Sequence, residues 1–418
     1  MPATVNTKYT NQGGLVTTLW PQKSVNLVVA RASPAIGIIP KDENADEFYW
    51  KKAVGTASNQ GFGSSYAGAR AARQPSKFKQ FDLQPYPYYG SDVIDGRTMR
   101  RGRKKPAVVV DLVKQVSKGM LSTMQRAISC YLHGNGGGAI AKIQTVVGSV
   151  ITLTPESKIG GLDEGFTIAT SVTDGTSGSV KAGSGIIGQI GGVEGAYTLT
   201  ADGGVNWSTL IATIANGDYI FRADTFGNVF HGFAGWNPQH SGAPGTFLGV
   251  NRDTNANKLA GWAVNCATLS TRQAIVTVAR RCYDAGGEPD VALISTKRWE
   301  SLANEAGTSG GVRMTKMPAA PINKISLGID YQAVEIIGPC GPIMILPDQH
   351  MPDDIVRVLT KDTWQFRSSG PLIQWIDNAK EGQLKMENDD DAYEFRLIGD
   401  FELECEAPGY NGMGYGLT

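Results

Sequence analysis

The chain is poor in the side chains that build metal centres, disulfide networks and hydrolytic sites. Its 418 residues include only 5 cysteines and 4 histidines. The cysteines are scattered, odd in number and form no CxxC pair, which argues against both a disulfide scaffold and a zinc site. We expect them to be buried free thiols of a protein made in a reducing compartment.

The sequence also lacks a surplus of charge and a long apolar run. Lysine plus arginine and aspartate plus glutamate each number 39, whereas a dedicated nucleic-acid binder usually has a basic excess. No apolar stretch approaches the roughly 20 residues that a membrane-spanning helix needs. The first residues do not combine a basic segment with an apolar core, so we expect no secretion signal. These absences predict a protein that is made in the cytoplasm, stays soluble and contacts no membrane.

Glycine is what the chain has in abundance. There are 52 glycines, well above the usual share of roughly 7%. Such a surplus favours many turns and bulges, as in β-rich proteins. With 41% hydrophobic and 19% charged residues, the composition is globular, and the length allows two or three domains.

The first hundred residues have little apolar material of their own. Residues 1–45 predict an irregular arm with short strands, divided by prolines. Residues 46–104 begin rich in glycine, serine, alanine and arginine, continue with aromatic residues alternating with polar ones, and carry the turn signal Asp95-Gly96. This pattern predicts a long hairpin that projects outward and gains its burial from a partner.

Residues 106–133 have the clearest helical periodicity in the chain. Apolar residues recur at spacings of one, three or four. They are Val109, Leu112, Val113, Val116, Met120, Met124, Ile128 and Leu132. Pro106 suits the first helical position and Gly134 suits the end. The helix should be about 40 Å long at 1.5 Å per residue.

The rest of the chain predicts a β-rich insertion followed by a mixed α/β part. Short β-branched runs over 139–225 indicate a small barrel or sandwich, and 226–269 is loop-like. Ser270 and Gln273 form a capping box that opens a helix. PDVALIS, TKRWESLANEA, AVEIIG, PIMILP and DIVRVL follow as strand, helix and three strands, and a final strand pair lies around YEFRLIGDFELEC. The predicted fold class is α+β.

This order of parts resembles the Hong Kong 97-type major capsid fold of tailed phages. PDVALISTKRWESLANEA looks like the strand-then-helix segment of that family, and AVEIIGPCGPIMILPDQHMPDDIVRVL looks like its two strands, turn and third strand. The resemblance implies five parts. These are an N-terminal arm (1–45), an extended loop (46–104), a spine helix (105–138), an inserted β-rich domain (139–225), and peripheral and axial domains (226–418).

The resemblance also implies a function. It predicts a major capsid protein that self-assembles into pentamers and hexamers, forming an icosahedral shell around double-stranded DNA in the virion. Scaffolding and portal proteins would be partners, and decoration proteins are further candidates. It implies a structural protein without cofactors, not an enzyme. An encapsulin-like compartment on the same fold is the alternative.

Two short motifs match catalytic or cofactor patterns. GSGIIG (183–188) fits a dinucleotide fingerprint, but the glycine-rich sequel cannot form the helix that the fingerprint requires. A turn in the β insertion explains it better. GTSGG (307–311) fits a nucleophile elbow around Ser309, yet none of the histidines can be assigned as its base. A hydrolase using Ser309 is therefore a weaker alternative than a surface loop.

Two runs of charge remain as candidate sites. The basic run consists of Arg97, Arg100, Arg101, Arg103, Lys104 and Lys105. It could contact phosphates of packaged DNA, or form an inter-subunit surface at the base of the extended loop, which we favour. The acidic run ENDDD (387–391) lacks the glycine and closing glutamate of a calcium loop. We expect a solvated turn there, which could pair with a neighbour's basic run.

Overall fold

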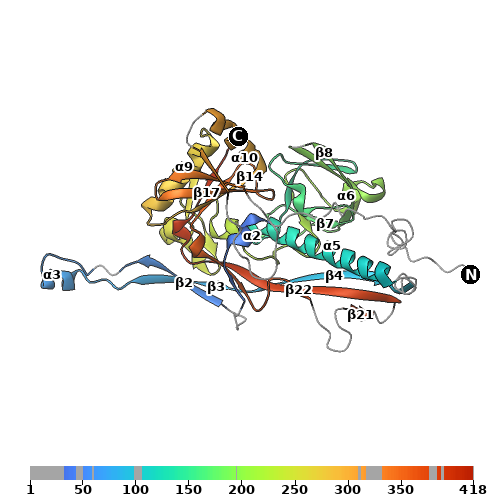
Figure 1. Ribbon diagram of the computed structural model, residues 1–418, viewed down its shortest axis with the longest axis horizontal. Helices are drawn as coiled ribbons and strands as arrows, with labels where there is room; N and C mark the ends of the chain where they lie inside the picture. The colour runs from blue at the N-terminus through green and yellow to red at the C-terminus, as the bar shows by residue number, and fades with distance from the viewer. Residues whose placement is uncertain are drawn as a thin grey trace, which may run out of the picture.

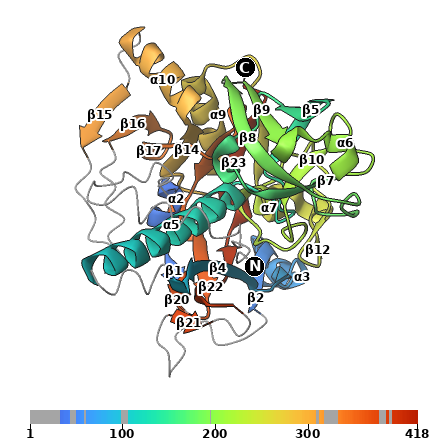
Figure 2. The same ribbon diagram turned by 90° about the vertical axis from the view of Figure 1, so that its right-hand side faces the viewer.

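One long helix lies between a β-ribbon below and two further units above it (Figure 1). The computed structural model describes residues 33–43, 50–58, 61–97, 106–193, 195–308, 312–316, 332–375, 384–386 and 390–417. A small barrel and an α/β unit stand side by side above the helix, and a hairpin projects from one end of the molecule (Figure 1). In Figure 2 the α/β unit and the barrel again lie next to each other on the same side of the helix.

The long helix is α5, Pro106–Leu132, which confirms the helix predicted over 106–133. Its described buried residues include Met120, Met124, Ile128 and Leu132, four of those that set the apolar periodicity. Helix α5 packs on strand β4 (Tyr86–Asp95). At Gly90 of β4 the two elements lie in close contact, since a Cβ there would be at van der Waals distance from Met120 (3.6 Å) and from Leu397 of the neighbouring strand (3.4 Å).

The ribbon below α5 is organised by one strand, β22, Ala392–Cys405. It pairs in antiparallel register with β4 from Ala392↔Asp95 to Phe401↔Tyr86. Its other partners are β19 (Trp364–Ser368), β20 (Gln374–Trp375) and β21 (Leu384–Met386), and β1 (Lys41–Asp42) pairs with β19.

This ribbon corrects two predictions. The strand pair predicted around 393–405 is a single strand, because Gly399 pairs directly with Tyr88 and continues the extended backbone instead of turning it. Tyr86–Asp95 does not belong to the projecting hairpin. Its aromatic side chains have a core to join within the same chain, where Tyr88 stacks on Phe401 at 5.2 Å between ring centroids.

The hairpin itself is shorter than predicted. Strands β2 (Trp50–Ala57) and β3 (Lys77–Leu83) pair with each other, and the short helix α3 (Tyr66–Ala71) lies toward the tip. Figure 1 shows the hairpin extending away from the rest of the molecule. The prediction of a projecting hairpin is therefore right for 50–83 and wrong for 86–95.

Residues 141–222 form a closed barrel, not a sandwich. The strand order is β10-β5-β6-β9-β8-β7. Their bounds are β5 Ala141–Val147, β6 Val150–Leu153, β7 Thr167–Ser171, β8 Gly185–Val193, β9 Ala196–Ala201 and β10 Tyr219–Arg222. Trp207, in α6 (Trp207–Leu210), is fully buried in its core. Most of GSGIIG is the start of strand β8, which corrects the predicted turn and leaves no helix for a dinucleotide to meet.

The α/β unit has a seven-stranded sheet in the order β13-β23-β18-β14-β17-β16-β15. The strands are β13 Trp262–Asn265, β14 Val291–Ser295, β15 Val312–Lys316, β16 Gln332–Gly338, β17 Gly341–Asp348, β18 Val356–Leu359 and β23 Gly412–Tyr415. Helices α9 (Thr271–Asp284) and α10 (Thr296–Thr308) pack with it. The capping box of Ser270 and Gln273 is confirmed.

Two segments predicted as irregular contain short elements. The part of the predicted arm that the structure describes forms helix α2 (Pro34–Ile38), with Ser33 as N-cap, before strand β1. Residues 226–261 contain α7 (Phe233–Trp236), β11 (Thr246–Phe247), β12 (Val250–Asn251), a 3₁₀ turn (Arg252–Asn255) and α8 (Ala256–Leu259). These elements are too short to produce a periodic signal, so the sequence could not predict them.

We expect Phe401→Ala to lower the free energy of unfolding by about 3–5 kcal/mol, because it empties a fully buried site among other aromatic rings. Urea titration of the unassembled subunit measures this change. Phe62→Ala is the matched control, since Phe62 is 92% exposed and should change stability by less than about 0.5 kcal/mol. Equal effects of the two substitutions would contradict this account of the core.

Candidate assembly surfaces

The projecting hairpin carries three of the four most exposed aromatic side chains in the described part of the chain. Phe62 is 92% exposed, Tyr66 80% and Phe78 66%. Single exposed apolar residues are common on protein surfaces, but three aromatic side chains on one projecting element are unusual for a monomer. Within the described part of the chain the outer hairpin has no core of its own, so these rings offer an apolar surface for a contact.

The hairpin also has a surplus of positive charge. Residues 50–83 contain one acidic residue, Asp82, against six basic ones. The basic residues are Lys51, Lys52, Arg70, Arg73, Lys77 and Lys79. The chain as a whole has no net charge, so this local surplus favours a partner surface that carries carboxylates or phosphates.

The root of the hairpin is fixed to the ribbon by ion pairs. Lys52 Nζ lies 2.6 Å from Glu404 Oε1 and also pairs with Glu406. Arg367 pairs with the other oxygen of Glu404, which is fully buried. Burial alone would lower the pKa of Lys52, but hydrogen bonds and attraction to Glu404 and Glu406 outweigh it and raise the pKa. Lys52 therefore stays protonated and keeps the hairpin root attached to the ribbon.

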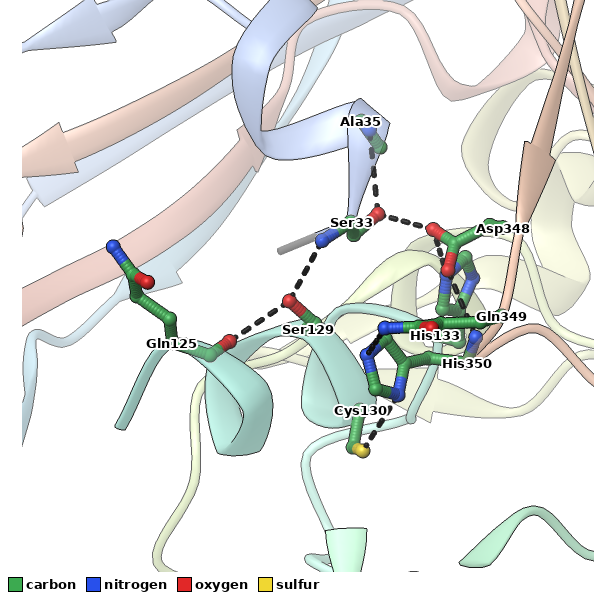
Figure 3. Close-up of polar contacts among 9 residues, drawn as sticks. All are labelled: Ser33, Ala35, Gln125, Ser129, Cys130, His133, Asp348, Gln349 and His350. Atoms are coloured by element: carbon green, nitrogen blue, oxygen red, sulfur yellow. Dashed lines mark hydrogen bonds and ion pairs between the residues drawn. The ribbon is translucent and has the colours of Figure 1, made fainter. Parts of the chain in front are cut away.

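A second buried carboxylate joins three distant segments (Figure 3). Asp348, at the end of β17, accepts hydrogen bonds from the Ser33 hydroxyl, from His133 Nε2 at 2.9 Å and from the His350 amide at 2.9 Å. The Ser33 amide donates to Ser129 Oγ at 2.8 Å. We call Ser33, Ser129, His133 and Asp348 the polar junction. It fixes the start of α2 to the end of α5 and to the α/β unit.

Asp348 remains ionised inside this junction. Burial alone would raise its pKa, but the charge and hydrogen bond of His133 and the donors from Ser33 and His350 lower the pKa to about 2. An ionised carboxylate can only accept hydrogen bonds. His133 Nε2 therefore carries the proton that it shares with Asp348.

The junction contains serine, histidine and aspartate but not in a catalytic order. A hydrolytic triad needs histidine between the serine and the acid. Here Asp348 lies between Ser33 and His133 and accepts the hydrogen bond that the Ser33 hydroxyl donates. The arrangement stabilises a junction and cannot activate Ser33 as a nucleophile.

Cys130 and His350 form a nearby pair that is equally unsuited to catalysis. Cys130 Sγ lies 3.3 Å from His350 Nδ1 (Figure 3). Burial raises the pKa of the Cys130 thiol to about 12, so the nucleophilic thiolate is not formed at neutral pH. All five cysteines are free; Cys266, Cys282 and Cys405 are buried as predicted. Cys340 is exposed, contrary to the prediction, because it lies in the turn between β16 and β17.

The barrel is tied to both neighbouring units. Arg126 of α5 pairs with Asp163 of the barrel, and Lys158 of the barrel lies 2.6 Å from Asp353 of the α/β unit. Asn135, after α5, donates to Asp174 at 2.6 Å. These contacts come from several sides, so the barrel braces α5 against the α/β unit.

The structure describes only part of the two charged runs. Arg97 is exposed and follows the end of β4; Arg100, Arg101, Arg103, Lys104 and Lys105 lie outside the described residues. Of this run only Arg97 can be placed: it lies away from the hairpin root, since β4 runs from that root to the opposite end of the ribbon (Figure 1). There the Gly96 amide donates to the Asp391 carbonyl at 2.7 Å. The basic run thus begins beside the acidic run of its own chain, of which 387–389 are not described.

Ser309 also lies outside the described residues, and Thr308 ends helix α10. Among the side chains that the structure places, no group of three or more His, Cys, Asp or Glu could hold a metal ion. No helix in the described ranges is long and apolar enough to cross a membrane.

Sequence reasoning missed Lys52, Glu404 and the polar junction. The members of each set lie on segments that are far apart in the sequence; Lys52 and Glu404, for example, are 352 residues apart. No local motif therefore joins them. A partial signal was available in Asp348-Gln349-His350, three polar residues directly after the predicted strand PIMILP.

Comparison with known proteins identifies relatives. The model of the family described as "SU10 major capsid protein" matches residues 179–418, more than half of the chain. No curated protein matches. Among solved structures, the capsid asymmetric unit of cyanophage A-1(L) has a TM-score of 0.53 at 13% identity, covering 97% of this chain and 99% of that chain.

Two other similar structures have lower scores. The capsid of a native GTA particle has a TM-score of 0.47 at 10% identity, with coverage of 95% of each chain. The SrpI encapsulin of Synechococcus elongatus PCC 7942 has a TM-score of 0.45 at 6% identity, covering 94% of this chain and 92% of that chain. The predicted phage-capsid fold with an inserted barrel is confirmed by the family match and by the cyanophage structure.

We expect Asp348→Asn to destabilise the subunit by about 2.5 kcal/mol at pH 7, since a pKa lowered from 3.8 to about 2 contributes this free energy. The depressed pKa makes the contribution complete above pH 4 and removes it as pH falls from 4 to 2. Urea titrations at several pH values measure the difference from the parent. It should shrink across that window.

The exposed Asp202 provides the control for this experiment, because Asp202→Asn keeps the same chemistry outside the junction. A difference between Asp348→Asn and the parent that stays constant from pH 7 to pH 2 would contradict the ionised junction.

Proposed function

Since the chain belongs to the SU10 major capsid protein family, we propose that its copies assemble as pentamers and hexamers into an icosahedral shell around packaged double-stranded DNA. As a major capsid protein it has a structural role in the virion shell. The proposal of pentamers and hexamers rests on the hairpin, whose aromatic and cationic side chains remain exposed within one subunit. The family match favours the viral shell over an encapsulin-like compartment.

Contacts of such a hairpin must be heterologous. The hairpin is at one end of the subunit, and it cannot bind the identical surface of another hairpin without bringing like charges together. A head-to-tail contact between a hairpin and a different surface closes into a ring when the rotation allows it. Pentamers and hexamers are rings of this kind, and each subunit contributes one hairpin and receives another.

We propose an inter-subunit role for the basic run, whose first residue, Arg97, follows the end of β4. Asp391 lies beside its start and can neutralise part of its charge within the subunit. A patch that is partly neutralised in this way is better suited to pairing with carboxylates of a neighbour than to holding DNA by charge alone. Scaffolding and portal proteins, and decoration proteins, are the further partners that such a shell would need. Synthesis in the cytoplasm of a host bacterium belongs to the same proposal.

We expect Phe62→Asp to abolish shell formation while leaving the fold of the subunit intact. The substitution places a charge where an aromatic ring should become buried in the next subunit. Negative-stain electron microscopy of the purified protein counts closed particles, and thermal unfolding shows whether the subunit is still folded. Phe62→Tyr keeps the ring and should assemble. Normal particles from Phe62→Asp would remove the hairpin tip from the proposed interface.

The basic run has a separate test in the absence of DNA. Replacing Arg97, Arg100, Arg101, Arg103, Lys104 and Lys105 by glutamine should reduce the yield of empty particles at least tenfold, because the run would no longer pair with a neighbouring subunit. Light scattering during assembly measures the yield. A normal yield of empty particles in this assay, together with less DNA retained when the same variant assembles in the presence of DNA, would instead assign the run to DNA contact.

A further inference from the structure

The hairpin changes from buried to exposed near its root on both strands. On β2 the last buried residue is Val54, at 5% exposure, and on β3 the first is Phe81, at 0%. Val54 pairs with Lys79 and Phe81 with Lys52, so burial extends two residues farther out on β2 than on β3. Residues 71–80 are all exposed. A β-bulge directly follows Val54, since the pairing shifts between Gly55 and Ala57. At this bulge the buried root meets the exposed outer part of the hairpin, which we call the blade.

One segment, residues 244–258, curves around this boundary and contacts both strands. We call it the cradle. The carbonyl of Leu248 accepts a hydrogen bond from the Asp82 amide of β3 at 3.2 Å. On the other strand, the carbonyl of Thr56, the bulged residue, accepts from Lys258 Nζ at 3.2 Å and from Asn255 Nδ2 at 3.4 Å. The side chains of Lys258 and Asn255 thus hold strand β2 at its bulge.

Arg252 gives the cradle its shape. The side chain is buried at 4% exposure and donates to the carbonyls of Gly235 at 2.7 Å and Pro244 at 3.0 Å. Its guanidinium lies over the ring of Phe247, 4.6 Å from the centroid. Phe247 in turn packs on Phe81 of the hairpin root and on Trp236. The arginine thus binds backbone carbonyls and fixes the loop against the root.

The cradle adopts an unfavourable backbone conformation where it meets β3. Leu248 has a φ of +44°, in the left-handed region that side chains such as leucine rarely occupy. This conformation occurs at the residue whose carbonyl binds Asp82. Strain of this kind persists only where surrounding contacts impose it, and here the contact is with the hairpin.

An open groove on the β2 side leaves room for the blade to turn. Its volume is about 600 Å³, and its lining includes Gly55 and Ser58 of the hairpin, Lys258 of the cradle, and Asp284 and Tyr410 of the α/β unit. Loss of the bonds to Thr56 would therefore not leave the strand confined by packed side chains on this side.

We propose that the cradle is a clamp that sets the direction of the hairpin, and that releasing the Thr56 carbonyl lets the blade swing about the bulge toward this groove. The importance of that direction for a shell rests on the proposed function, but the clamp is a property of the single subunit. A neighbouring subunit that competes for Lys258 or Asn255 would couple assembly to the angle of the hairpin.

The clamp is testable by distance measurement in the unassembled full-length protein. Spin labels on the exposed Cys340 and on Ser64→Cys report the position of the blade relative to the body by double electron–electron resonance. We expect one narrow distance distribution in this parent. Asn255→Ala combined with Lys258→Met should broaden it at least twofold. Lys51→Met, the same substitution on an exposed lysine of β2, is the matched control and should leave it unchanged.

A distribution in the clamp variant that matches the parent would overturn the proposal, as would a parent distribution that is already broad. Thermal unfolding verifies that each variant is folded. If the double variant fails to fold, Lys258→Gln, which retains most of the stem without the charge, is measured with the same criteria. Particle formation plays no part in these measurements, so a failure of the clamp is distinguishable from a failure of the Phe62 test.

Discussion

Strand β22 is the element on which the rest of the subunit depends. It pairs with β4 on one side and with β19, β20 and β21 on the other, and its Phe401 and Leu403 belong to the main core. The same strand supplies the buried carboxylates Glu402 and Glu404. It therefore contributes to the hydrophobic core that α5 joins, and it supplies the carboxylate that pairs with Lys52 at the hairpin root. Any displacement of β22 would move both.

The buried carboxylates act as connectors more than as sources of stability. An ion pair in a protein interior often contributes little net free energy, because desolvation offsets the attraction. Removal of one partner is costly, however, since it leaves a buried charge. Asp348 joins α2, α5 and β17, Glu404 joins the hairpin root to β19, and Glu402 accepts from the amide and the ring of His231 at 2.9 and 3.1 Å. We infer that these groups select one arrangement of segments whose apolar surfaces alone would tolerate several.

Sequence patterns predicted what local periodicity determines. The long helix, the capping box of Ser270, the β-rich insertion and the outward hairpin all follow from spacing or composition within a few tens of residues. The division between hairpin and ribbon was not predictable. Tyr86–Asp95 and Lys77–Leu83 have similar alternation, and only the pairing of the former with β22, some 300 residues away, separates them. The same reason explains why Lys52 and Ser33 carried no signal and Asp348 only a partial one: each acquires its role from a contact that the fold creates.

The structure divides the subunit into a body that satisfies itself and an element that does not. The barrel and the α/β unit each enclose a hydrophobic core, the last turns of α5 join the main core, and these parts are linked by Arg126–Asp163 and Lys158–Asp353. This bracing limits relative movement, because each link bridges separate units. The hairpin has the opposite character, with buried side chains only at its root. A shell that must form by repeated weak contacts benefits from this division: the rigid body defines where the next subunit can lie, while the hairpin supplies a contact surface that remains free until that subunit arrives.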